Sequence, residues 1–190
     1  LLSTLDCPVE VYADDSTMTE TAPTVSEIED KLTNNCRKVS SWMASNKLQL
    51  NASKTHFLLV GTQERLRKTD QPAVHMDGLL LKENNEKCEL LLGVEIQANL
   101  KWNTQIIKVI GKLKNRLVGL NKLKFLVPYQ TRNTIVIGIF NSVLVYCLPL
   151  FGGCNKGQVK DLQALQNKAG QIVAHKPPYT NRKDLYDQTG

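Results

Sequence analysis

Residues 9–19 read VEVYADDSTMT, and they decide how the first half of the chain is interpreted. Residues 9–13 have the β-branched and aromatic composition of a short strand. Asp14, Asp15 and Ser16 supply turn chemistry, and residues 17–19 return as a second strand. The pattern predicts a β-hairpin with Asp14 and Asp15 at its tip.

A helix is expected soon after this hairpin. Thr24 and Glu27 have the spacing of a capping box, in which the two residues satisfy each other's backbone N–H groups. Apolar residues then recur every three or four positions, which predicts one buried face and a helix that ends near Asn46. The stripe consists of Val25, Ile28, Leu32, Cys36, Val39 and Met43.

The segment up to residue 100 reads as strands and loops. Residues 54–61 are mostly apolar and end at a glycine, which predicts a buried strand, and the polar residues 62–72 predict a loop. Asp77-Gly78 between apolar residues predicts a two-residue β-hairpin turn. Residues 89–96 predict one further strand with Gly93 inside it, where a backbone could approach closely.

The remainder of the chain reads as helical. A first helix should stop at Pro128, and its apolar side chains fall within about 40° of one direction when residues are placed 100° apart. Those side chains are Ile106, Ile110, Leu113, Leu117 and Leu120, and the lysines of the opposite face are Lys101, Lys108, Lys112 and Lys122.

Two more helices and a short tail helix should follow. Residues 131–147 are apolar on most sides, so this helix is expected to be central. Residues 156–175 should form the next helix, which Pro177-Pro178 ends, and the tail helix should start at Asn181. The expected buried side of the 156–175 helix consists of Leu162, Leu165, Ala169, Ile172 and Val173. The fold class predicted for the chain is therefore α+β.

The net charge of +6 is divided unevenly along the chain. Residues 1–100 hold 10 Lys and Arg against 15 Asp and Glu, so 10 − 15 = −5, and residues 101–190 hold 14 against 3, so 14 − 3 = +11. A basic half favours a polyanionic partner. Solvated helix faces are the alternative explanation.

Other features exclude several classes of protein. No apolar run approaches the roughly 18 residues that a membrane span needs, so no membrane partner is expected. The five cysteines are odd in number and contain no C-x-x-C pair, which favours buried thiols in a reducing compartment over disulfides or a zinc site. The sequence starts at Leu1 in mid-pattern, so we expect a fragment.

Adjacent carboxylates at a hairpin tip concentrate negative charge on a rigid support. Magnesium is usually held by one or two carboxylates together with substrate phosphates, and nucleotidyl transfer uses two such ions about 4 Å apart. Asp14 and Asp15 are therefore candidate metal ligands. An Asp-Asp pair on its own is more often plain turn chemistry. The full Tyr12-Ala13-Asp14-Asp15 motif is much rarer.

Four segments carry a family resemblance in their order along the chain. They are VYADD at 11–15, WMASNKLQLNASKT at 42–55, LGV at 92–94 with LKW at 100–102, and LQALQNKA at 162–169. Together they resemble the reverse transcriptases of non-LTR (LINE- or jockey-like) retrotransposons, from polymerase motif C onward. The resemblance covers nearly the whole chain and implies the later part of a polymerase palm at residues 1–100 and a helical thumb with an extension at 101–190.

The resemblance also implies roles for individual residues. Asp14 and Asp15 would hold Mg²⁺, and Lys54, the motif D lysine, would neutralise the departing pyrophosphate. Tyr12 and Ala13 would lie near the primer end and the nucleotide. Gly93 would lie near the primer grip. The lysines of the 101–122 face would contact the phosphates of the template–primer duplex, with a solvated helix face as the alternative.

The implied activity is RNA-directed DNA polymerisation. Its partners would be an RNA template, a DNA primer, deoxynucleotides and the missing N-terminal palm and fingers of the same polypeptide, in the cytoplasm and nucleus. The family's other indispensable aspartate would precede Leu1, so we expect this fragment alone to be inactive. Gln105, Cys147, Phe151 and Gln171 depart from the family pattern. An inactive nucleic-acid-binding remnant and an inert pseudogene product therefore stay open.

Overall fold

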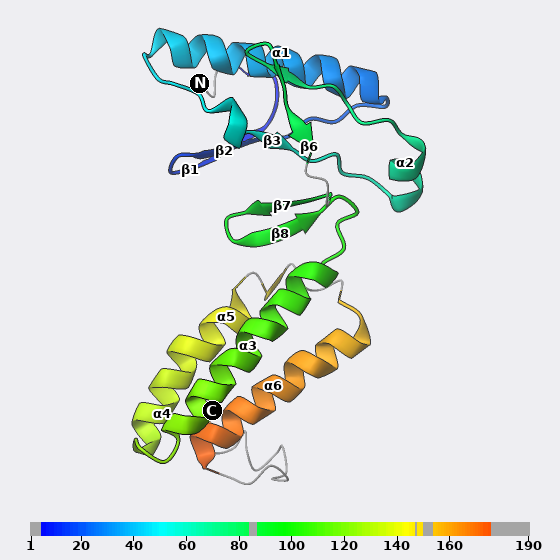
Figure 1. Cartoon of the computed structure of the whole chain (residues 1–190). Coiled ribbons are helices and arrows are strands. Elements are labelled where there is room, and N and C mark those ends of the chain that lie inside the picture. The colour runs from blue at the N-terminus through cyan, green and yellow to red at the C-terminus, as the bar shows by residue number, and fades with distance from the viewer. Residues whose placement is uncertain (1–4, 84–86, 147, 150–153, 176–190) are drawn as a thin grey trace. The chain divides into compact units, whose positions relative to one another are not determined.

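The structure is a computed structural model of the chain, and it describes residues 5–83, 87–146, 148–149 and 154–175. The fold is mixed α+β, as predicted, with short strands and the long helix α1 in the first half and mostly helices in the second (Figure 1). The chain forms two compact units. The N-terminal unit comprises Leu1–Glu89 with Gln97–Leu100, and the helical unit comprises Leu90–Ile96 with Lys101–Gly190.

The predicted first hairpin is present in the N-terminal unit. Strand β1 (Val9–Tyr12) pairs antiparallel with β2 (Asp15–Met18), and Tyr12 lies opposite Asp15. The turn consists of Ala13 and Asp14, one position earlier than predicted, so Asp15 opens β2 and is not a turn residue. Ala13 reaches this tight reversal with a φ of 54°, in the left-handed region.

Helix α1 (Val25–Ser45) begins and ends where the sequence predicts. The Thr24 hydroxyl accepts a hydrogen bond from the backbone N–H of Glu27 at 3.3 Å, and Asn46 is the C-cap residue. The predicted stripe faces a small core. That core contains buried Cys36, Val39, Val74, Met76 and Leu81, with Met18, Leu32, Met43 and Phe57 among the partly buried residues around it.

The prediction of a buried strand over residues 54–61 is wrong. A short 3₁₀ helix, η2 (Ala52–Lys54), precedes a two-residue strand, β3 (His56–Phe57), which pairs in parallel with β6 (Lys82–Glu83). Val60 is 47% exposed. An apolar run becomes a buried strand only where a long partner strand and a covering layer exist, and β6 supplies neither.

The prediction of a loop over residues 62–72 is also wrong, because residues 63–68 form helix α2 (Gln63–Lys68). The Thr62 hydroxyl caps it by accepting from the N–H of Arg65, and Lys68 pairs with Glu64 at 2.8 Å one turn earlier. A cap, such a pair and the partial burial of Leu66 favour a short helix in a segment of good helix formers.

The second predicted hairpin is confirmed, and the strand predicted for residues 89–96 proves to be a third hairpin. Strands β4 (His75–Met76) and β5 (Leu79–Leu80) flank Asp77 and Gly78, which have φ values of 50° and 76°. Strands β7 (Cys88–Leu91) and β8 (Val94–Gln97) pair in the same way around Leu92 and Gly93, with φ values of 48° and 80°. Gly93 therefore lies in a turn and not within a strand, and two successive left-handed residues are typical of a tight two-residue hairpin turn.

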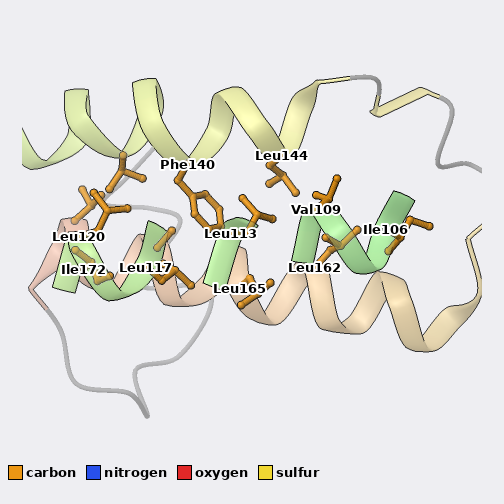
Figure 2. Packing of buried hydrophobic residues seen from close by; sticks show 13 residues of the cluster. Ile106, Val109, Leu113, Leu117, Leu120, Phe140, Leu144, Leu162, Leu165 and Ile172 are labelled. Atoms are coloured by element: carbon orange, nitrogen blue, oxygen red, sulfur yellow. The ribbon is translucent and has the colours of Figure 1, made fainter. Parts of the chain in front are cut away.

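The helical unit packs three helical segments around one core. Helix α3 (Asn103–Leu123), helix α6 (Lys156–Ala174) and the run formed by α4 (Tyr129–Val136), the π-helical turn η3 (Ile137–Asn141) and α5 (Ser142–Val145) all contribute side chains to that core (Figure 2). The predicted apolar side of α6 is buried in full, and that of α3 is buried except for the partly buried Ile110. The core includes Ile106, Leu113, Leu117, Phe140, Leu144, Leu165 and Ile172.

The prediction that the 131–147 helix is central is wrong. Of its apolar side chains, Val136, Phe140 and Leu144 are buried, whereas Ile137 and Val145 are 52% and 56% exposed. Burial at every fourth residue marks a surface helix with one packed face. None of the three described segments is central, because α3 and α6 contact each other and both contact the α4–α5 run.

Arg132 ties the three helices together. Its guanidinium donates to the carbonyls of Lys124 at 2.7 Å, Val127 at 3.2 Å and Val173 at 3.1 Å. These carbonyls belong to or follow helix ends, where intrahelical donors are lacking. The expected stop at Pro177-Pro178, the tail helix from Asn181 and Cys147 lie outside the described residues.

Two sequence expectations concern cysteines and membranes. Among the residues that the structure describes, Cys7, Cys36, Cys88 and Cys154 are free thiols, and Cys36 and Cys88 are buried. Burial raises the pKa of Cys36 to about 11. No helix in the described part of the chain is long and apolar enough to cross a membrane.

Candidate functional site

The β1–β2 hairpin presents both candidate metal ligands to solvent. Asp14 is the second residue of the turn and Asp15 the first residue of β2, and both are exposed. Residues opposite each other in a two-stranded sheet share a face, so Asp15 lies on the face of Tyr12. Met18 lies on the other face and packs against the core of the N-terminal unit. Asp15 therefore points away from that core.

Neither carboxylate is engaged within the described part of the chain. No hydrogen bond or ion pair there involves the side chain of Asp14 or Asp15. Structural aspartates at turns commonly bond their own backbone, and these two do not. The pair is thus available to an external cation.

Tyr12 and Ala13 complete the exposed tip. The Tyr12 side chain is 67% exposed and Val11 is 51% exposed, although aromatic and β-branched residues usually lie inside. Ala13 occupies the left-handed region with no glycine to relieve it, at a cost of about 1 kcal/mol. The hairpin thus combines an exposed aromatic ring, a strained turn and two unpaired acids.

The two aspartates form at most part of a metal site. Within the described residues, no group of three or more His, Cys, Asp or Glu side chains is placed to hold a metal ion. Two carboxylates fit Mg²⁺ when substrate phosphates supply further oxygen ligands. The donor set therefore fits an ion that a nucleotide or another segment helps to hold.

Lys54 lies in the same unit as the aspartates but makes no bond to them. It is the last residue of η2, and its backbone N–H donates to the Asn51 carbonyl at 3.0 Å. Its side chain is exposed. No hydrogen bond or ion pair among the described residues joins it to Asp14 or Asp15.

Gly93 and the lysine face belong to the helical unit. The Tyr146 hydroxyl donates to the Leu92 carbonyl at 2.5 Å, next to Gly93, so the β7–β8 turn is held to the end of α5. A Cβ at Gly93 would lie 3.9 Å from that hydroxyl oxygen, an ordinary contact. The positive φ of 80°, and not crowding, is therefore what requires glycine here.

The four predicted phosphate-contacting lysines are exposed but not equivalent. Lys108 forms an ion pair at 2.6 Å with Glu95, whose side chain is 9% exposed, and Lys101 also has a partner. Lys112 and Lys122 have no such partner in the described part of the chain. Lys112 and Lys122 therefore remain candidates for the predicted phosphate contacts, because no ion pair within the described part of the chain engages them.

Glu95 and Gln105 are structural polar residues that the sequence analysis missed. The Gln105 side-chain oxygen accepts from the backbone N–H of Glu95 at 3.0 Å, and both residues are buried. The second carboxylate oxygen of Glu95 has no protein partner. The one available signal was an acidic residue, Glu95, among the apolar residues of the strand predicted over residues 89–96.

The chain matches no protein-family model, and no curated protein or solved structure is significantly similar to it.

Proposed function

We propose that the chain is the later part of the polymerase domain of a reverse transcriptase of the non-LTR retrotransposon type. The observation that carries this proposal is the β1–β2 hairpin, which presents Asp14 and Asp15 in solvent with no protein partner in the described part of the chain. The order of the four family-like sequence segments supports it.

The two halves would be part of a palm and a thumb. Residues 1–100 would supply the catalytic hairpin, α1 and further strands of a palm, and residues 101–190 would supply a helical thumb with its extension. A layered helical body with its own core at α3, α4–α5 and α6 is compatible with a thumb. The face of α3 with Lys112 and Lys122 would meet duplex phosphates.

Each residue of the proposed site has a physical task. Asp14 would be the main Mg²⁺ ligand and Asp15 its less direct partner, as the family resemblance implies for these two positions. The bound ions would supply activation of the primer hydroxyl and charge neutralisation at the phosphates. Tyr12 would position the primer end, and the Lys54 ammonium would stabilise charge that develops on pyrophosphate.

Primer extension tests the proposal. A longer polypeptide that carries this chain after its natural upstream segment should extend an RNA-templated primer with Mg²⁺, whereas the 190-residue chain alone should not. In the longer protein, Asp14→Ala should lower incorporation by at least about a thousandfold, since metal ligands stabilise transition-state charge.

The second hairpin offers a matched control. Asp77 also lies at a two-residue turn, so Asp77→Ala removes the same charge from a similar site and should leave incorporation unchanged. Incorporation that survives Asp14→Ala would refute both the site and the mechanism.

An inactive nucleic-acid-binding remnant is the second candidate. The observation that favours it is the basic surface of α3, where Lys112 and Lys122 are exposed and have no ion-pair partner in the described residues. Duplex binding that weakens steeply with salt, without incorporation by the longer polypeptide, would favour this candidate.

A further inference from the structure

A second site lies in the N-terminal unit, apart from the β1–β2 hairpin. A half-open cavity of about 240 Å³ lies between α2 and the residues at the end of β8. Its lining contains two cations, Arg67 and Lys87, and three side-chain amides, Gln63, Gln97 and Asn99. No carboxylate is among the described residues that line it.

The backbone builds this cavity from three separate segments. The N–H of Ala98 donates to the Lys87 carbonyl at 2.9 Å, and the Ala98 carbonyl accepts from the N–H of Gly61 at 2.9 Å. Ala98 is 3% exposed, so both bonds are shielded from water. The two bonds hold residue 87 and the segment that leads into α2 against the 97–99 segment.

One face of α2 forms the opposite wall. Gln63, Leu66 and Arg67 are spaced i, i+3 and i+4, which places all three on the same side of the helix. The partly buried Leu66 supplies an apolar floor. Arg65 and the Glu64–Lys68 ion pair do not line the cavity.

The two cations that line the cavity are unpaired within the described part of the chain. The side chains of Arg67 and Lys87 have no hydrogen bond or ion pair there, whereas Lys68 is paired with Glu64. Both residues are exposed, and an anion bound in the cavity that they line would be attracted to both cations. The guanidinium fork of Arg67 suits the paired oxygens of a phosphate.

The size of the cavity limits how much of a ligand it can enclose. At about 240 Å³ it is smaller than the roughly 300 Å³ at which complete small-molecule sites begin. The cavity therefore has room for a phosphate group but would not enclose a whole nucleotide, so the remainder of any larger molecule would lie outside its open side.

We propose that this cavity is a phosphate-binding site in which Arg67 and Lys87 hold a phosphate monoester or diester. The amide of Gln63 borders the same space and would orient a remaining oxygen, whereas Gln97 and Asn99, which also border it, already have other partners. The site is separate from Asp14 and Asp15 and does not depend on the proposed polymerase activity.

Amide chemical shifts of the isotope-labelled 190-residue chain test the site. Inorganic phosphate added at constant ionic strength should give saturable shifts confined to residues 61–68, 87–88 and 97–99. Arg67→Gln and Lys87→Gln should each weaken binding at least about tenfold, because each removes a charge-assisted contact. Arg65→Gln removes the same charge from the same helix outside the cavity and should leave affinity within about twofold.

Further arms identify the source of the phosphate. If a DNA oligonucleotide displaces inorganic phosphate, the ligand is the nucleic-acid backbone; if only phosphate or a nucleoside monophosphate saturates the site, it is a small phosphate compound. Asp14→Asn should change neither result. Absence of saturable shifts, an equal loss in Arg65→Gln, or unchanged affinity in the Arg67→Gln/Lys87→Gln double variant would overturn the site.

Discussion

Two aspartates at hairpin tips show how the setting of a residue decides its chemistry. Asp77 precedes Gly78, and an Asp-Gly pair is a preferred sequence for a two-residue hairpin turn, so Asp77 needs no further explanation. Asp14 instead follows Ala13, which is strained at a φ of 54°, and adjoins a second carboxylate. Two adjacent unpaired acids repel each other, and a divalent cation relieves that repulsion. Asp14 is therefore the better candidate for metal binding.

Manganese binding checks this difference between the two tips. Mn²⁺ should broaden the amide resonances of residues 12–16 of the 190-residue chain at lower concentration than those of residues 76–79. Asp14→Asn should weaken this broadening by roughly tenfold, the effect of losing one charged ligand, whereas Asp77→Asn should not. Equal broadening at both tips would show that Asp14 and Asp15 bind no better than an isolated turn aspartate.

The buried thiol of Cys36 makes stability depend on pH. Burial raises its pKa from 9.0 to about 11, with nearby Asp77 adding to the shift. The folded state holds the neutral thiol more firmly than the unfolded state does, so this contribution is complete below about pH 9 and is lost as the pH rises through about 11.

Urea unfolding of the wild-type chain and of Cys36→Ala from pH 8 to pH 11 measures this contribution. The alanine variant should be destabilised at pH 8 by about 1 kcal/mol through lost burial. The difference between the two proteins should shrink as the pH approaches 11, because only the wild type loses the thiol contribution. If the difference in unfolding free energy between the two proteins stays constant or grows toward pH 11, the raised pKa of Cys36 is contradicted.

Within a secondary-structure element, the backbone conformation decides whether glycine is favourable: a tight turn favours it and a helix interior does not. Gly93 joins β7 to β8 with a φ of 80°, where an L side chain is strained whatever the free space. Gly111 lies inside α3, and a Cβ there would meet nothing within 4 Å. The backbone conformation of the element, and not local crowding, therefore decides whether a glycine-to-alanine change stabilises or destabilises the chain.

Paired alanine substitutions separate the two cases. Gly93→Ala should destabilise the chain by about 1 kcal/mol through backbone strain. Gly111→Ala should stabilise it by about 0.5–1 kcal/mol, because it restricts the unfolded chain and removes a poor helix former. Urea midpoints measure both. A stabilising effect at residue 93 would mean that the β7–β8 turn differs from the structure.

The whole molecule consists of two units that each have a core and that carry different parts of the proposed machinery. The hairpin with Asp14 belongs to the N-terminal unit and the lysines of α3 to the helical unit. Lys112 is exposed without an ion-pair partner in the described part of the chain, whereas Lys108 holds the buried Glu95 at 2.6 Å. Lysines on one helix therefore serve different purposes.

Duplex binding and unfolding distinguish these purposes. Lys112→Gln should lower the slope of log affinity against log salt by about 1 and leave stability unchanged. Lys108→Gln should destabilise the chain by about 1–2 kcal/mol, because it leaves Glu95 buried without its cation. If both variants have the same effect on both measurements, the distinction drawn from the ion pair is wrong.

Much of the local structure follows from short patterns in the sequence. The Thr24 cap, the stripe from Leu32 to Met43 and the Asp77-Gly78 turn each depend on residues within a few positions of one another. The apolar side of α6 was predictable for the same reason. Helix periodicity and turn chemistry are local, so one sequence was enough.

The sequence by itself determined the long helices, two of the hairpins and the place of the Asp14-Asp15 motif at the first hairpin, but not the short helix α2. Only the tertiary structure decided that residues 54–61 lack a long partner strand, that the α4–α5 run has an exposed apolar side, and that Lys108 pairs with Glu95. It also assembled the cavity of Arg67 and Lys87 from segments 20 positions apart. Burial and pairing between residues that are distant in sequence depend on which surfaces meet when the chain packs. The periodicity of the sequence specifies local structure and does not specify these contacts.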